Sequence, residues 1–160
     1  MKAEKRHCDA AQSLKEAGLN RTPQRVAVLD MLIHAERPIT ASDILRGIND
    51  SLDINRVTVY RIISCLKDHE IIREIPTHDG INHYEMACMH NPLHPHFYCR
   101  VCKTMYCLDP PTIATAWEWL AGPHDYTVEG ISIGLYGLCR DCRQKLERDT
   151  VAHVSREDYT

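Results

Sequence analysis

The sequence predicts an α+β protein with a helical N-terminal half and a C-terminal half of short strands and helices. Three observations lead to this prediction. Apolar residues recur at helical spacing in several segments before residue 70. Two segments of strand-like composition follow, on either side of a short turn. Beyond residue 90 the chain carries a His-x-His and two Cys-x-x-Cys pairs, a pattern typical of metal ligands. We therefore expect a metal to shape the C-terminal half.

The composition is that of a globular protein, with 44% hydrophobic and 26% charged residues in a chain of 160. We find no apolar leader and no stretch long enough to span a bilayer, so we expect a cytoplasmic protein without membrane association. In that reducing compartment, paired cysteines favour metal binding over disulfides. The net charge is −3, and residues 1–86 hold 12 Lys and Arg against 13 Asp and Glu. Any contact with nucleic acid must therefore come from a local basic face.

Four helices are predicted in the N-terminal half. The first covers residues 8–18. The second begins at Pro23, because proline is preorganised for the first helical position, and ends before Pro38. Residues 40–43 cap a third helix. The apolar stripe of a fourth helix consists of Val57, Val59, Ile62, Ile63 and Leu66.

A hairpin is predicted after these helices, with strands at residues 71–75 and 81–86 around a turn at residues 77–80. Packed helices followed by such a hairpin are typical of a winged helix-turn-helix domain. We therefore predict this domain over residues 1–86.

The rest of the chain is predicted to form a small α/β domain at residues 96–149, after a Cys-, His- and Pro-rich hinge at residues 87–95. A loose polar tail is expected at residues 150–160. The expected elements of the small domain are strands at 96–100 and 104–108, a helix at 113–120, a strand at 126–138 and a helix at 140–148.

The two cysteine pairs predict a structural zinc site made of Cys99, Cys102, Cys139 and Cys142. Two thiolates separated by two residues lie on one tight turn and face one ion, so two such turns complete a tetrahedral site. Zn(II) suits this role because it has no redox chemistry and its binding free energy contributes to folding. The alternative, that some of the four are only buried thiols, is weaker against two matched pairs.

Five segments carry a further pattern: residues 18–25, 57–61, 83–85 and 94–96, and residues 135–139 with the sequence Leu-Tyr-Gly-Leu-Cys. Through them the chain resembles the ferric uptake regulator family of bacterial metal-responsive repressors, from about Leu14 to Leu146. The resemblance implies an N-terminal winged helix and a C-terminal dimerisation domain. It also implies a homodimer that binds a palindromic double-stranded DNA operator when a regulatory metal is bound near the hinge. Repression is the usual outcome among relatives, and the sequence leaves activation open.

In a winged helix, the fourth helix is expected to lie in the major groove, with the face opposite its apolar stripe toward the DNA. There the Tyr60 ring can meet a thymine methyl group, and Arg56 and Arg61 can reach guanine edges or phosphates. The alternative is an ordinary solvated helix face. The predicted DNA-binding residues are Arg56, Thr58, Tyr60 and Arg61, with Lys15, Arg21 and Arg25 on the DNA backbone.

The resemblance also implies a regulatory metal site, and this chain matches only part of the family's ligand set. The family's helix histidine falls on Pro38, and its last carboxylate falls on Cys107. The implied ligands are Glu85, His94, His96 and Cys107. One oxygen, two nitrogens and one sulfur favour tetrahedral Zn(II) over six-coordinate Fe(II), so we expect zinc, with Fe(II) or Mn(II) as alternatives.

Four further donors leave the membership of this site open: Cys88, His90, His78 and His83. In particular, Cys88 could replace Glu85. No role is expected for Cys8, Cys65 or His124, which are taken as core, terminal or surface residues.

The expected function is therefore that of a zinc-dependent transcriptional repressor. The main alternative is an iron- or peroxide-responsive regulator of the same family. A redox protein with an iron site, or with Cys102 and Cys107 as a switch pair, is a weaker one. An enzyme is not expected, because the P-C-x-x-C motif of zinc deaminases is absent: Tyr98 and Leu138 precede the two Cys-x-x-Cys pairs, and the His-Pro-His motif contains no Glu.

Overall fold

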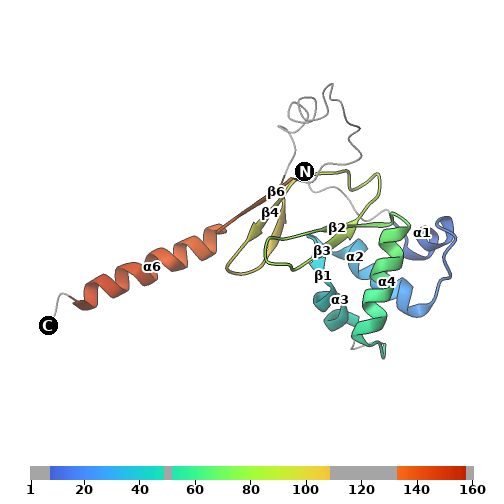
Figure 1. The fold of residues 1–160 in the computed structure, drawn as a ribbon, viewed down its shortest axis with the longest axis horizontal. Helices are drawn as coiled ribbons and strands as arrows, with labels where there is room; N and C mark the ends of the chain where they lie inside the picture. Colours follow the sequence, from blue (N-terminus) through green and yellow to red (C-terminus); the bar gives the residue numbers. More distant parts are fainter. Residues whose placement is uncertain (1–7, 49–51, 109–132, 158–160) are drawn as a thin grey trace, which may run out of the picture.

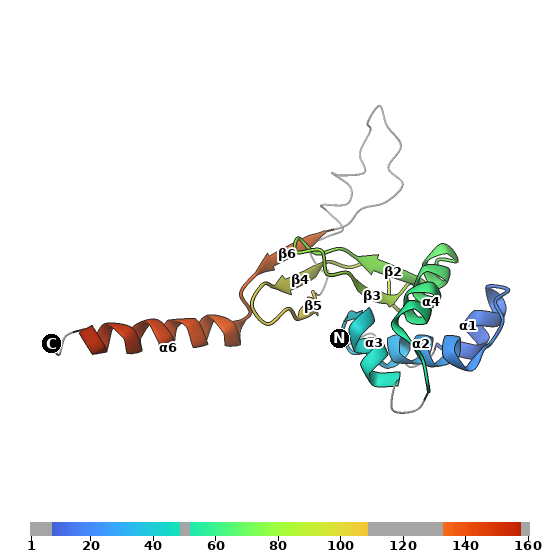
Figure 2. The same cartoon turned by 60° about the horizontal axis from the view of Figure 1, so that its bottom comes forward.

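The computed structural model describes residues 8–48, 52–108 and 133–157, with side chains described up to residue 148. Its elements form two three-stranded sheets, one packed against the N-terminal helices and one followed by the last helix (Figure 1). In Figures 1 and 2 the second sheet lies between the helical part and α6, which extends away from the rest of the molecule. No helix in these described ranges has the length and apolar character needed to cross a membrane.

Helix α1 (Ala10–Glu16) has well-defined caps at both ends. Asp9 caps its start, with the carboxylate accepting the Gln12 N–H at 2.6 Å. At its end Gly18 takes φ +70°, and the Leu19 N–H donates to the Leu14 carbonyl at 2.8 Å. This is a Schellman motif, which a glycine adopts without steric strain. The helix is therefore short and fixed in place.

The next helices start as the sequence predicts. Helix α2 (Pro23–His34) begins with proline at its first position, behind the cap Thr22. Helix α3 (Ala41–Ile48) is preceded by a reciprocal cap, in which Thr40 N–H donates to the Asp43 carboxylate and Asp43 N–H donates to the Thr40 hydroxyl, both at 3.1 Å. Helix α4 (Arg56–Asp68) is capped by Asn55.

The first sheet has the strand order β1-β3-β2 and is antiparallel throughout. It contains β1 (Ile39–Thr40), β2 (Ile72–Ile75) and β3 (His83–Met86). Together with α1 to α4 it encloses the main core, whose fully buried side chains include Leu14, Leu29, Leu32, Ile44, Val59 and Leu66. Helices and hairpin together form the expected winged helix.

The second sheet has the order β5-β4-β6, with β4 (His96–Cys99) in the centre. Strand β5 (Met105–Cys107) pairs with it antiparallel, and β6 (Gly134–Gly137) pairs with it parallel. Helix α6 (Arg140–Glu157) follows β6 directly. A small apolar cluster of Ile75, Tyr98 and Met105 links the two sheets.

The structure differs from the sequence prediction in several places. The two-residue strand β1 was not predicted, and α6 continues to Glu157, through most of the stretch expected as a loose tail. Val57, assigned to the apolar stripe of the fourth helix, is 67% exposed. The expected helix at 113–120 lies outside the described residues, as does most of the strand at 126–138, of which 134–137 is a strand.

Candidate metal centres and nucleic-acid interface

The four paired cysteines converge at one end of the second sheet. Cys99 ends β4 and Cys102 lies in the turn after it, whereas Cys139 and Cys142 lie at the start of α6. The parallel register of β4 and β6, with Cys99 opposite Gly137, brings the two turns together. All four sulfurs lie within 4.8 Å of one another, and Cys102 and Cys139 are 3.8 Å apart. A tetrahedral zinc–thiolate site with bonds of about 2.3 Å has sulfur–sulfur edges of about 3.8 Å. The geometry therefore fits zinc.

Backbone N–H groups prepare Cys99 for this role. Burial alone would raise the pKa of this thiol, but N–H groups of Cys139, Cys102 and Val101 lower its pKa to about 6. The Cys139 N–H lies 3.3 Å from the Cys99 sulfur. The thiolate, which is the form that binds metal, is thereby favoured at neutral pH.

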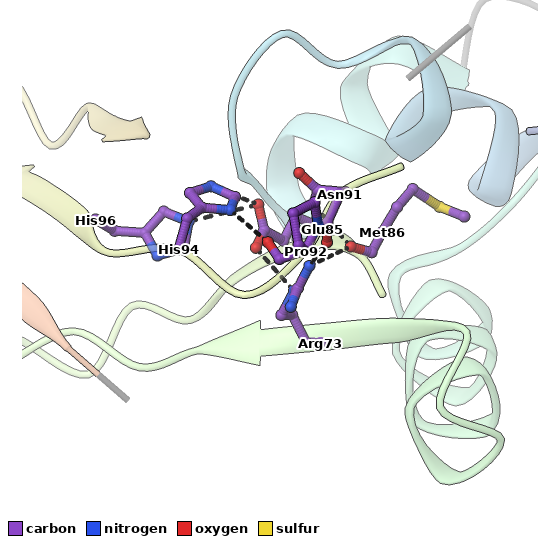
Figure 3. Close-up of polar contacts among 7 residues, drawn as sticks. All are labelled: Arg73, Glu85, Met86, Asn91, Pro92, His94 and His96. Carbon is purple, nitrogen blue, oxygen red and sulfur yellow. Dashed lines mark hydrogen bonds and ion pairs between the residues drawn. The ribbon is translucent and has the colours of Figure 1, made fainter. Parts of the chain in front are cut away.

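A second cluster lies between the two sheets and contains Glu85, His94, His96 and Cys107. Glu85 projects from β3, His94 precedes β4, and His96 begins β4 directly opposite Cys107 on β5. Their donor atoms all lie within 4.8 Å of one another. Glu85 Oε2 is 3.4 Å from His96 Nε2 and 3.6 Å from His94 Nε2 (Figure 3). We call these four residues the interdomain cluster.

The interdomain cluster contains buried polar atoms that are not satisfied by the described residues. Glu85 Oε2 and the Nε2 atoms of His94 and His96 are buried without a hydrogen-bond partner there, whereas Glu85 Oε1 is ion-paired with Arg73. Each buried group left in this state costs about 1–3 kcal/mol. His94 Nδ1 lies 2.8 Å from the Pro92 carbonyl, which can only accept, so Nδ1 is the donor of this bond and Nε2 is the ring atom that faces Glu85. A tetrahedral metal ion would satisfy these atoms.

Arg73 holds the Glu85 carboxylate from the other side. The two residues are opposite one another on β2 and β3, and Arg73 Nε lies 2.9 Å from Glu85 Oε1. The guanidinium also donates to the carbonyls of Met86 and Asn91 (Figure 3). Burial alone would raise the pKa of Glu85, but His96, His94 and Arg73 hold its pKa below the ordinary value. Glu85 is therefore an anion with one oxygen directed toward the histidines.

The other donors considered from sequence lie outside the interdomain cluster. His78 stacks on Tyr136, with ring centroids 4.8 Å apart. His83 is buried edge-on against Tyr98, and burial lowers its pKa, so it is neutral. Cys88 and His90 instead lie with Cys8, for which no role was expected. Because 80 residues separate Cys8 from Cys88, no local pattern could have indicated that contact.

The exposed face of α4 carries several of the predicted DNA contacts. Arg56, Tyr60 and Arg61 are exposed, and the Arg56 guanidinium lies 5.5 Å from the centre of the Tyr60 ring. The Thr58 hydroxyl instead donates to the Asn55 side chain at 3.0 Å. Val57 is exposed on this face, which the sequence analysis missed, although its position off the apolar stripe could have indicated it.

The remaining predicted contacts lie on α1, in the loop before α2 and on α2 itself. Lys15 and Arg21 are exposed, whereas Arg25 is half-buried and donates to the Asn20 carbonyl at 3.0 Å. A groove beside α4 is also lined by Arg37 and Arg46, two basic residues not predicted from sequence.

Comparison with known proteins identifies the family. A model of the ferric uptake regulator family matches residues 16–136, three quarters of the chain. The chain belongs to the ferric uptake regulator family. It is therefore a metal-responsive transcriptional regulator, and members of this family bind DNA and act as dimers.

The similar proteins in this family include ferric uptake regulators and a peroxide-responsive repressor. A ferric uptake regulation protein of Campylobacter upsaliensis is 28% identical over 135 residues, covering 82% of this chain and 85% of the relative. The peroxide-responsive repressor PerR of Staphylococcus saprophyticus is 30% identical over 138 residues, covering 86% and 91%. The crystal structure of the Vibrio cholerae ferric uptake regulator, 27% identical, has a TM-score of 0.71, covering 82% of this chain and all of that one. The predicted family and its α+β fold are thus confirmed.

Proposed function

We propose that this member of the ferric uptake regulator family is a zinc-responsive repressor. In this proposal Zn(II) binds Glu85, His94, His96 and Cys107, and the zinc-loaded homodimer binds a palindromic operator. A second, structural Zn(II) binds the four paired cysteines. The observation that carries the choice of metal is Cys107, a sulfur donor directly across the sheet from His96.

The donor chemistry supports zinc. Thiolate and imidazole ligands suit Zn(II), and four donors suit its tetrahedral preference. Fe(II) and Mn(II) prefer more oxygen ligands and a larger coordination number. An iron- or peroxide-responsive regulator is the second candidate, because the relatives include both a ferric uptake regulation protein and PerR.

The elements that supply the ligands support a mechanism. Glu85 belongs to β3 of the first sheet, and His96 and Cys107 belong to the second sheet. A metal held by all of them would fix the angle between a DNA-binding domain at residues 1–86 and a dimerisation domain at residues 96–149, with residues 87–95 as the hinge. In a two-fold dimer, that angle sets the distance between the two α4 helices. To bind the operator, the two α4 helices must enter major grooves that are separated by about one turn of the DNA helix or a multiple of one turn.

The exposed residues of α4 support its role as the recognition helix. Arg56, Tyr60 and Arg61 would contact bases and phosphates, and Val57 would meet a thymine methyl group. Lys15, Arg21 and Arg25 would contact the DNA backbone, with Arg37 and Arg46 in the adjoining groove. Thr58 would act mainly through the cap of α4, because its hydroxyl is bonded to Asn55.

The test is the metal dependence of operator binding after Cys107→Ser. An operator is first selected from random DNA duplexes with zinc-loaded protein, and its affinity is then measured by fluorescence anisotropy with and without buffered Zn(II). Metal typically raises operator affinity by roughly 5- to 150-fold in such coupled systems. We expect most of this gain to be lost in Cys107→Ser and kept in Cys65→Ser, a matched control outside all three cysteine clusters.

Two further outcomes distinguish the candidates. Cys107→Asp restores an oxygen donor and should shift activation from Zn(II) toward Fe(II) or Mn(II). Activation of the wild-type protein by Fe(II) or Mn(II) but not by Zn(II) would establish the second candidate. An unchanged zinc response in Cys107→Ser would contradict the assignment of Cys107 as a ligand.

A further inference from the structure

We propose that Cys8, Cys88 and His90 form a third metal site, which binds Zn(II) and ties the start of α1 to the segment between the two sheets. This site lies outside the four paired cysteines and outside the interdomain cluster. The Cys8 sulfur is 3.3 Å from the Cys88 sulfur and 3.7 Å from His90 Nδ1. All three donor atoms lie within 4.8 Å of one another.

Both sides of this site are held in place by the surrounding structure. Cys8 directly precedes Asp9, the cap of α1, and Ala10 and Leu14 anchor that helix in the main core. Cys8 and Cys88 also pack against the same core. The three donors are therefore brought together by the fold and not by a chance approach of a free terminus.

A turn after β3 presents the other two donors together. The Ala87 N–H donates to the Ile71 carbonyl, and the Asn91 N–H donates to the Cys88 carbonyl, both at 2.9 Å. Asn91 is itself buried and donates from its side chain to the Met86 carbonyl. Cys88 and His90 are thus two residues apart on a turn that is bonded at both ends.

The distances suit zinc with little adjustment. With zinc–sulfur bonds of about 2.3 Å and zinc–nitrogen bonds of about 2.0–2.1 Å, a tetrahedral site has sulfur–nitrogen edges of about 3.6 Å. The Cys8 to His90 distance of 3.7 Å is close to this value. The two sulfurs, now 3.3 Å apart, would separate by about half an ångström. Three protein donors leave the fourth position for water.

The donor types exclude the hard cations. Two thiolates and one imidazole, without a carboxylate, are poor ligands for Mg(II), Ca(II) or Mn(II) and good ligands for Zn(II). Zinc here would link the segment that precedes α1 to the stretch that leads to His94. Its binding does not depend on whether the interdomain cluster also binds zinc.

The experiment counts zinc ions bound to the full-length protein. Protein purified under reducing, anaerobic conditions is dialysed against buffered Zn(II), and bound zinc is measured by mass spectrometry of the metal. We expect about three ions per chain in the wild type and in Cys65→Ser, and about two in Cys8→Ser and in Cys88→Ser. Cys8→His replaces one zinc ligand by another and should restore the third ion.

A second measurement covers the case in which a variant folds poorly. Hydrogen exchange of the α1 amides should slow on addition of Zn(II) in the wild type and in Cys65→Ser, and should not change in Cys8→Ser. Three ions in Cys8→Ser would overturn the proposal. So would a Cys8–Cys88 disulfide in the anaerobic protein, detected as a loss of two hydrogen masses. The Cys107→Ser variant tests the interdomain cluster separately, because its loss of an ion is independent of Cys8.

Discussion

At the scale of single residues, Glu85 is a buried carboxylate held by charged and polar groups on two sides. It is 1% exposed, and its two oxygens have opposite surroundings, with a guanidinium on one side and two imidazoles on the other. A buried carboxylate is tolerated only when paired, so His96, His94 and Arg73 together keep Glu85 ionised before any metal arrives, and Arg73 is the one of the three that carries a permanent charge. Arg73 thereby keeps the interdomain cluster ready for a cation.

Replacing Arg73 by Met should expose this dependence. The measurement is made with a weak chelator that leaves zinc on the four paired cysteines but keeps the interdomain cluster free of metal. Under these conditions we expect the free energy of unfolding of Arg73→Met to be about 3 kcal/mol lower than that of the wild type, because Glu85 is left without its cationic partner. Saturating Zn(II) should recover part of the loss. Urea denaturation with and without Zn(II) measures both effects, and equal stability of variant and wild type in the chelator would contradict them.

At the scale of elements, the α4 helix joins folding to DNA recognition at its first turn. The Asn55 side chain accepts the Thr58 N–H at 2.9 Å and the Thr58 hydroxyl at 3.0 Å. This cap lies next to the exposed residues Arg56 and Val57. The start of the helix is therefore fixed by the same turn that faces the DNA in our proposal.

Two substitutions at Asn55 separate these roles. Asn55→Ala removes the cap and should lower the free energy of unfolding by about 1 kcal/mol. Asn55→Asp retains a capping oxygen, so stability should stay near that of the wild type. The added negative charge should instead weaken operator binding, most strongly at low salt. Urea denaturation and anisotropy titrations at two salt concentrations test this, and identical profiles for the two variants would count against it.

Helices α1 to α4 were predictable from the sequence because each has a capping residue at its start and apolar residues that the fold buries. The miss at Val57 has a geometric reason: it lies two positions, or about 200°, from Val59 on the helix, and so falls off the stripe. Strand β1 has only two residues, and pairing with β3 defines it without any local signal. The interdomain cluster followed from family positions, whereas Cys8 joins its partners through tertiary packing alone.

At the scale of the whole molecule, the turn between β2 and β3, which is the tip of the wing, is hydrogen-bonded to the second sheet. The Asp79 carboxylate accepts hydrogen bonds from Thr77 at 2.6 Å, Tyr98 at 2.8 Å and Lys103 at 2.7 Å. The Lys103 contact, followed by that of Thr77, holds the pKa of Asp79 well below its ordinary value. Tyr98 belongs to β4 and Lys103 follows Cys102 directly, so Asp79 connects the wing to the four-cysteine turn.

Asp79→Asn should loosen this connection. We expect faster hydrogen exchange at the wing turn and lower stability, because the charge that Lys103 pairs with is gone. The folded pKa of Asp79 lies below its unfolded value of about 3.9, so its contribution is complete above that pH and is lost only as the pH falls further. The deficit should therefore be the same at pH 7 and pH 5. A deficit that differs between these two pH values would assign the effect to another group.

The placement of the metal donors along the chain has a consequence for synthesis. Seven of the eleven candidate ligands, four plus four plus three across the clusters, lie in the eighteen residues from Glu85 to Cys102. On the ribosome, the cluster of Cys8, Cys88 and His90 is complete once residue 90 has emerged, and the other two await Cys107 and then Cys142. A nascent chain can therefore bind a metal ion through cysteine and histidine side chains before the second sheet can form.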